Sequence, residues 1–147
     1  MATPSASLTV PGVLEAVPHV RRWLGELLAG WRLSEPDAAD LALAVTEVCT
    51  NIARHGYRDA AGDIEVHVAR DAGGVHVTIL DQAPPFVPDQ VSLPSPEALA
   101  EGGYGLALVR RVIDEMHVQP VAGGGNRTVL VKRQRAEPGG RGGTRPR

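Results

Sequence analysis

The pattern that most constrains the fold is a pair of short alternating segments joined by a glycine-containing connection. Residues 64–68 and 75–79 each alternate apolar with polar side chains, and residues 70–74 between them include two glycines. Alternation with a period of two is typical of a strand that buries one face, and the short connection predicts a β-hairpin. Such a hairpin has one apolar face, which other elements of the chain must cover.

Two amphipathic helices are predicted upstream of the hairpin. The first runs from residue 16 or 17 to Gly30. The second begins after Ser34, whose hydroxyl can cap a helix and which is followed three residues later by Asp37, and it ends at Gly56. The apolar stripe of this second helix consists of Leu41, Val45, Val48 and Ile52.

The remaining elements complete the order β-α-α-β-β-α-β-β. A short strand is expected at 8–10, a third helix at 105–116, and two further strands at 117–121 and 128–133. Residues 83–103 carry five prolines and no periodicity, which is typical of a functional loop. The order predicts an α+β fold, a two-layer sandwich with a mostly antiparallel sheet and helices on one face.

Length and composition indicate a single globular domain. The chain has 147 residues, of which 43% are hydrophobic and 22% charged, and we expect the domain to span 8–133 after a flexible segment at 1–7. Residues 134–147 hold four arginines and one glutamate among glycines and prolines, which predicts a disordered basic tail. Because the net charge is −2, the rest of the chain carries −5, which argues against direct nucleic-acid binding.

The cellular location is predicted from apolar runs and cysteine content. No apolar run is long enough to span a bilayer, and the first residues lack the charged-then-apolar pattern of a signal peptide. The single cysteine, Cys49, cannot form an internal disulfide and is expected to be a small buried side chain. We therefore expect a cytoplasmic protein that does not associate with membranes.

Three polar residues, Glu47, Asn51 and His55, recur at intervals of four on the second predicted helix. Residues four apart share a helix face, and Glu47 and Asn51 lie about a quarter turn from the apolar stripe. A carboxylate there can polarise a hydroxyl group, and an amide oxygen suits Mg²⁺. A polar helix edge that faces solvent is the alternative interpretation. His55, at the helix end, is expected to have a secondary role in orienting the following loop.

Asp81 follows the second strand of the hairpin and is in phase with its buried positions. Its side chain is therefore expected to project toward the apolar side of the strand. An ionised carboxylate in such a place requires a hydrogen-bonding partner. The exocyclic amine of adenine would supply one, and an aspartate that begins a turn after the strand explains the residue equally well.

A glycine cluster at 102–105 opens the third predicted helix. Glycines allow backbone N–H groups to approach an anion, and a helix start favours negative charge, so phosphate is the expected ligand. The cluster lacks the Gly-Lys-Ser/Thr of a P-loop and does not follow a strand, which argues against a dinucleotide-binding fold. Thr128 opens the last strand, where a hydroxyl can reach a base, although threonine is also a good strand former.

Four sequence boxes in this order resemble those of the GHKL-type ATPases. They are Glu47-x-x-x-Asn51 with His55-Gly56, Asp81-x-Ala83-Pro84-Pro85-Phe86, Gly103-Tyr104-Gly105-Leu106 and Asn126-Arg127-Thr128. The resemblance covers about residues 8–133. Within the superfamily the chain is similar to the compact bacterial anti-sigma factor serine/threonine kinases.

The resemblance implies a Bergerat fold, in which Mg²⁺ and ATP are held between the sheet and the helices under a mobile lid. It implies that Asn51 binds Mg²⁺, that Asp81 receives the adenine amine and that Glu47 is the general base. Further contacts with the nucleotide are implied for the phosphate-cradling Gly103 and Gly105, for the adenine-fixing Thr128, and for His55, Ala83, Phe86, Tyr104 and Leu106.

The same resemblance implies protein partners. Such a protein binds and silences a sigma factor, phosphorylates a serine or threonine of a small antagonist protein, and is often a homodimer. A nucleotide-gated clamp that sequesters its partner without turning over ATP is the alternative function.

One box departs from the usual pattern. Ala83 stands where the family usually has a glycine, and its methyl group adds bulk where the backbone passes the base. In addition, neither lysine nor arginine occurs between Asp81 and Tyr104, so the loop itself brings no cation to the phosphates. We expect weaker or slower nucleotide binding from these departures, and not its loss.

Overall fold

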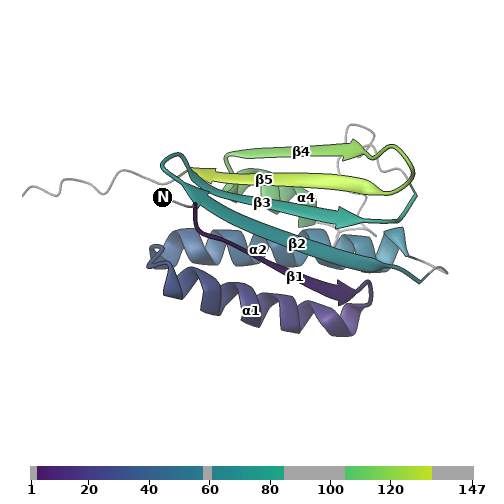
Figure 1. Ribbon diagram of the computed structural model, residues 1–147, viewed down its shortest axis with the longest axis horizontal. Helices are drawn as coiled ribbons and strands as arrows, with labels where there is room; N and C mark the ends of the chain where they lie inside the picture. The colour runs from purple at the N-terminus through teal and green to yellow at the C-terminus, as the bar shows by residue number, and fades with distance from the viewer. Residues whose placement is uncertain (1–2, 58–60, 85–104, 134–147) are drawn as a thin grey trace, which may run out of the picture.

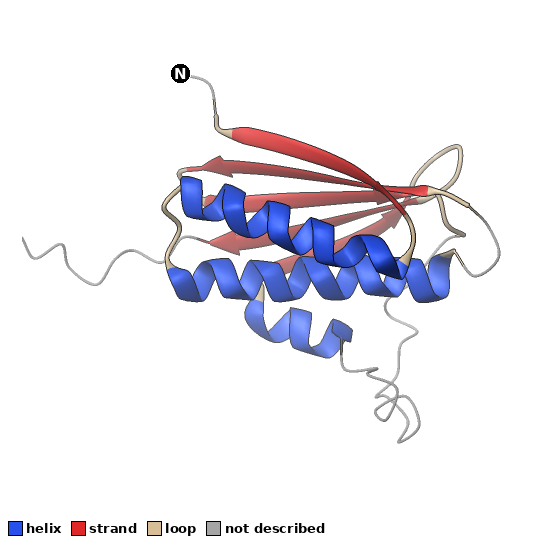
Figure 2. Cartoon of the chain, turned by 90° about the horizontal axis from the view of Figure 1, so that it is seen from below, coloured by secondary structure: helices blue, strands red, loops and turns tan. Residues whose placement is uncertain are grey.

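The computed structural model describes residues 3–57, 61–84 and 105–133, which form two layers (Figures 1 and 2). One layer is a sheet with the strand order β1-β2-β3-β5-β4, in which every neighbouring pair is antiparallel. The helices lie together on one face of this sheet, and in the described part of the chain nothing covers the other face. The predicted α+β architecture is therefore confirmed.

The elements follow the predicted order with some shifted bounds. The strands are β1 (Ser5–Pro11), β2 (Asp63–Asp71), β3 (Gly74–Asp81), β4 (Glu115–Pro120) and β5 (Asn126–Arg133). The helices are the short 3-10 turn η1 (Leu14–Ala16), then α1 (Val17–Gly30), α2 (Glu35–Asn51), the π-helical turn η2 (Ile52–Gly56) and α4 (Gly105–Val112).

The first strand begins earlier than the sequence indicated. Residues 5–7 pair with residues 67–69 of β2, so the expectation of a flexible segment through residue 7 does not hold for them. The small side chains of Ser5, Ala6 and Ser7 gave no alternating apolar pattern from which the strand start could be predicted.

The second helix is capped as predicted but ends differently. The Ser34 hydroxyl oxygen accepts a hydrogen bond from the backbone N–H of Asp37 at 3.3 Å. At the other end the Tyr57 N–H donates to the Ile52 carbonyl at 3.0 Å, which closes a π-helical turn instead of a further α-helical one. The helix still ends at Gly56, but its last turn is wider than an α-helical turn.

The third predicted helix is shorter than expected, because the chain turns into the sheet after Val112. The backbone N–H of Asp114 donates to the Val131 carbonyl at 3.0 Å, and the Arg133 N–H donates to Asp114 Oδ2 at 2.6 Å. These two bonds belong to the corner that starts β4. Met116, which was expected on the helix, consequently lies in β4 opposite Leu130.

The core lies between the helices and the inner face of the sheet. Its fully buried side chains include Val66, Val77 and Leu130 from the sheet and Leu24, Leu28 and Leu41 from the helices. Cys49 is also fully buried, as predicted, and burial raises the pKa of its thiol to about 12. The thiol is therefore protonated at neutral pH and acts as a small core side chain.

Replacing Gly125 with alanine is expected to destabilise the fold far more than the same replacement at Gly123. Both glycines have a φ of +96°, so both substitutions carry backbone strain of about 1–3 kcal/mol. At Gly125 the new Cβ would also lie 2.0 Å from the Asp81 carbonyl oxygen, whereas at Gly123 nothing lies within 4 Å. Urea unfolding measures both losses, and equal values would show that the close approach to Asp81 is without consequence.

Candidate nucleotide site

Glu47 and Asn51 lie on α2 at the edge of its buried face. Both side chains are partly buried, which agrees with their predicted position beside the apolar stripe. Neither side chain forms a hydrogen bond or ion pair with another described residue. His55 is exposed, and it lies in η2, where the wider turn moves it off the line that Glu47 and Asn51 share.

Asp81 ends β3 with its carboxylate on the inner face of the sheet. The residue is only 7% exposed, as its phase with the buried positions predicted. Its Oδ1 accepts hydrogen bonds from the Ala83 N–H at 2.8 Å and from Asn126 Nδ2 at 3.0 Å. The first bond closes a turn after β3, as expected from the alternative interpretation in which Asp81 begins a turn. Both bonds go to Oδ1, so Oδ2 can still accept a hydrogen bond from another group.

Asn126 holds this end of the sheet together. It is 3% exposed and lies directly opposite Asp81 in the pairing of β3 with β5. Its Nδ2 reaches Asp81 Oδ1 at 3.0 Å, the Pro84 carbonyl at 3.0 Å and the Ala83 carbonyl at 3.4 Å. Three acceptors surround one amino group, which fixes the orientation of the amide. Asn126 thus orients the carboxylate of Asp81.

Ala83 and Gly56 bring the end of the helical layer against the end of β3. Ala83 is 4% exposed, and a Cβ built on Gly56 would lie 2.9 Å from the Ala83 Cβ. The space that a side chain at position 56 would need is therefore occupied by the Ala83 methyl group. The methyl group that departs from the family pattern is accommodated by the glycine that ends η2.

Tyr57 links the start of β2 to the end of β3. Its hydroxyl donates to the Asp63 carbonyl at 2.8 Å and accepts from the Gln82 N–H at 2.5 Å. Burial raises the pKa of this hydroxyl, and the carboxylates of Asp81 and Asp63 raise it further, against the opposing effect of the Gln82 N–H. The phenol therefore stays protonated at neutral pH and keeps its donor.

The other expected site residues fall partly inside the described ranges. Thr128 is buried on β5, two residues from Asn126 and opposite Ile79, so it shares the inner face with Asp81. Leu106 is partly buried in the first turn of α4. In Figure 2 the N-terminal end of α4 lies toward the same end of the helical layer as the C-terminal end of α2. Phe86, Gly103 and Tyr104 lie outside the described residues.

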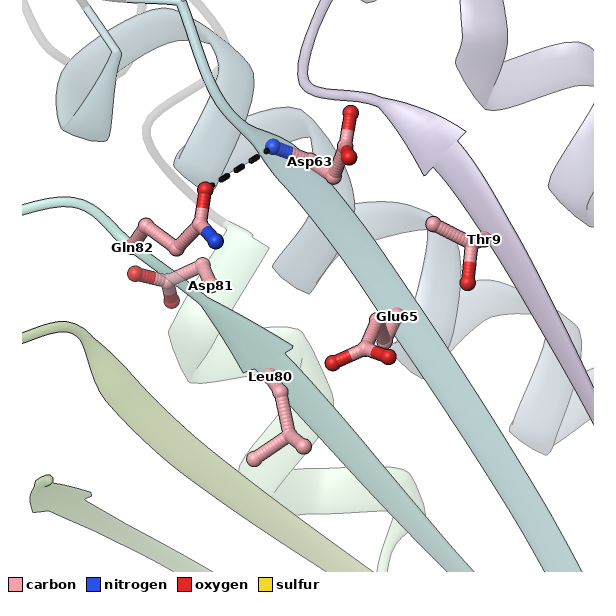
Figure 3. A pocket seen from close by; sticks show the side chains of 6 residues that line it. All are labelled: Thr9, Asp63, Glu65, Leu80, Asp81 and Gln82. Carbon is pink, nitrogen blue, oxygen red and sulfur yellow. Dashed lines mark hydrogen bonds between the residues drawn. The ribbon is translucent and has the colours of Figure 1, made fainter.

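A hollow of about 200 Å³ lies at the end of β3, partly lined by Asp81, and it opens on the uncovered face of the sheet (Figure 3). Glu65 and Leu80, which form part of its wall, are paired residues on the uncovered face, alternating with the buried Val66 and Ile79. Thr9, Asp63, Asp81 and Gln82 complete the wall. The carboxylates of Asp63 and Glu65 in its wall would repel a triphosphate.

Two useful residues were not recognised from the sequence. Asn126 belongs to the last of the four sequence boxes, but its residue type and position alone did not predict a role, and the same is true of Tyr57. The signal for Asn126 was its two-residue spacing from Thr128, which places both on one face of a strand. Its contact with Asp81 could be deduced only with the register of β3 and β5.

Comparison with known proteins identifies the family. Residues 10–132 match the family model of the histidine kinase-like ATPase domain. The chain belongs to this family. Asp81, Asn126 and the α2 residues Glu47 and Asn51 all lie within the matched range.

Relatives within the family are named serine-protein kinase RsbW. The protein of Bacillus licheniformis is 31% identical over 140 residues, which cover 88% of this chain and 87% of the relative. The protein of Bacillus subtilis is 30% identical over 125 residues, which cover 79% of this chain and 78% of the relative. The similarity thus extends over most of both chains.

Solved structures support the same fold. The RsbU and RsbW domains of a Mycobacterium tuberculosis protein align with a TM-score of 0.67 at 27% identity, covering 89% of this chain and 32% of that one. The present chain therefore spans about a third of that longer chain. A histidine kinase domain from Erythrobacter litoralis shares the fold, with a TM-score of 0.54 at 18% identity. No helix within the described ranges has the length and apolar character needed to cross a membrane.

Replacing Asn126 with alanine is expected to lower the free energy of unfolding by about 1–3 kcal/mol, because buried acceptors lose their donor. Gln119→Ala, at an exposed position of β4, is the control and should change the free energy by less than about 0.5 kcal/mol. Chemical denaturation of both variants checks this. A similar small change in both would mean that Asn126 does not hold Asp81 in place.

Proposed function

We propose that this chain is an ATP-dependent serine/threonine protein kinase of the RsbW type, which phosphorylates a small antagonist protein and sequesters a sigma factor. The observation that carries the proposal is the Asp81 carboxylate, whose Oδ1 is bound by Ala83 and Asn126 while Oδ2 remains able to accept. Membership of an ATPase family and the names of the relatives support the choice of nucleotide and reaction.

The adenine amine suits Asp81 for a physical reason. A carboxylate that is 7% exposed needs donors for both oxygens, and the described residues supply donors to only one. An exocyclic amine would complete the set, with Thr128 on the neighbouring strand of the same face. The inward methyl of Ala83 is already packed against Gly56, so it need not weaken binding as the sequence suggested.

Magnesium would be bound mainly through the phosphates. The described residues contain no group of three or more His, Cys, Asp or Glu side chains arranged to hold a metal ion. Mg²⁺ commonly takes one or two protein ligands and fills its other positions with phosphate oxygens and water. We assign this ligand role to the side-chain oxygen of Asn51, which is partly buried and forms no hydrogen bond with another described residue.

Glu47 is the residue to which we assign proton transfer. It lies one helical turn before Asn51 on the same face of α2, so both side chains would face the same phosphate group. Glu47 would accept the proton of the substrate hydroxyl as that oxygen bonds to the γ-phosphorus and ADP departs. Positioning and charge neutralisation, which Asn51 and the backbone at Gly105 would assist, would supply most of the remaining rate enhancement.

The proposed partners also indicate where in the cell the kinase acts. Sigma factors and their antagonists act in the cytoplasm, so we place the protein there, and we propose that it works as a homodimer without contacting nucleic acid itself. The negative charge of the body outside the tail at 134–147 is consistent with binding through protein surfaces rather than through a phosphate backbone.

Asp81→Asn is expected to weaken ATP binding at least tenfold, about 1.4 kcal/mol. The amide keeps an acceptor for Asn126 and Ala83 but replaces the other carboxylate oxygen with a donor, which cannot receive an amine. Asp63→Asn, at an exposed position of β2 on the uncovered face, is the matched control and should bind ATP normally. Calorimetry with Mg²⁺-ATP and ADP measures the affinities, and unchanged binding by Asp81→Asn would exclude Asp81 as the adenine acceptor.

Glu47→Ala is expected to bind Mg²⁺-ATP with nearly native affinity while transferring phosphate about 10²–10⁴-fold more slowly. Labelled ATP and candidate antagonist proteins provide the assay, with Glu65→Ala on the uncovered face as the control. Normal transfer by Glu47→Ala would remove Glu47 from the mechanism. ATP-dependent binding of the antagonist by the native chain, with no label transferred, would instead identify a nucleotide-gated clamp.

A further inference from the structure

Lys132 is a buried cation that connects three elements. It lies on the inner face of β5, where it is 6% exposed. Its Nζ donates to Asp40 Oδ2 of α2 at 2.8 Å and to the backbone carbonyl of Val112 at 2.7 Å. Val112 is the last residue of α4, so one ammonium group ties α4 to both the sheet and α2.

The contact suits the end of a helix. The last carbonyls of a helix have no partner within it and carry partial negative charge, so a cation there is favourable. A buried ammonium group is stable only when it is paired and hydrogen-bonded, and Asp40 and Val112 meet that need. The bonds of Lys132 therefore favour one position of the C-terminal end of α4 relative to β5 and α2.

The same end of α4 is held by the backbone. The Asp114 N–H donates to the Val131 carbonyl, and Asp114 Oδ2 accepts from the Arg133 N–H. Val109 and Ile113 are buried beside this end, and α4 packs against α2. The C-terminal end of α4 is thus fixed, and the direction of the helix from that end determines where its N-terminus lies.

We propose that Lys132 is a positioning residue for the phosphates of the nucleotide. It sets the direction of α4 from the Val112 end, and Gly105 at the other end lies about 10 Å away along the helix axis. This proposal rests on the proposed function, in which the backbone at Gly105 meets the phosphates. Lys132 itself does not contact the nucleotide but acts through the helix.

Positioning of this kind has a distinctive consequence. Asp81 and Thr128 recognise the base from the sheet, and their places do not depend on the direction of α4. Loss of Lys132 should therefore weaken the binding of a triphosphate nucleotide while sparing the binding of a nucleoside. A residue that merely stabilised the fold would weaken both equally.

The test compares Lys132→Met with Arg133→Met, which removes the same charge from the next residue of β5, where the side chain is 64% exposed. The double variant Lys132→Met with Asp40→Leu removes the carboxylate that the single variant leaves unpaired, so it guards against misfolding. Dissociation constants for Mg²⁺-ATP and for adenosine are measured by displacement of a fluorescent ATP analogue, and circular dichroism checks the fold.

We expect Lys132→Met and the double variant to bind Mg²⁺-ATP at least about tenfold more weakly and adenosine within about twofold of the native chain. Arg133→Met should match the native chain for both ligands. Native affinity for Mg²⁺-ATP in the folded double variant, or equal losses for both ligands, would overturn the positioning role. A native chain that binds no ATP would instead overturn the proposed function, and this inference with it.

Discussion

The pairing of β3 with β5 is the constraint on which the candidate site depends. It sets Asp81 directly opposite Asn126, and it brings Gly125 so close to the Asp81 carbonyl that no side chain fits there. A carboxylate on the inner face of a sheet is costly unless donors meet it, and this register supplies one from the neighbouring strand. Asp81 thereby becomes an acceptor with a fixed direction, which is what recognition of a base requires.

Features that depend on near neighbours in sequence were predictable. The hairpin followed from alternation, the start of α2 from the capping hydroxyl of Ser34, and the inward direction of Asp81 from its phase with the strand before it. The partly buried setting of Glu47 and Asn51 followed from helical geometry in the same way. The roles assigned to these residues rest on the family resemblance and on the proposals above.

Features that depend on distant residues were not predictable. Asn126 meets Asp81 across 45 positions of sequence, and Lys132 meets Asp40 across 92, so no local pattern reports either contact. The early end of α4 has the same cause, because the corner after Val112 is fixed by hydrogen bonds with β5. The local sequence pattern predicted which helices and strands form, whereas the C-terminal end of α4 is set by tertiary contacts.

The contact between Gly56 and Ala83 links the helical layer to the end of β3. One ends the π-helical turn after α2, and the other begins the loop after β3, yet the two positions share room for a single methyl group. Divergence at one position is therefore conditional on the residue at the other. A side chain at position 56 requires either a glycine at position 83 or a shift of one segment away from the other.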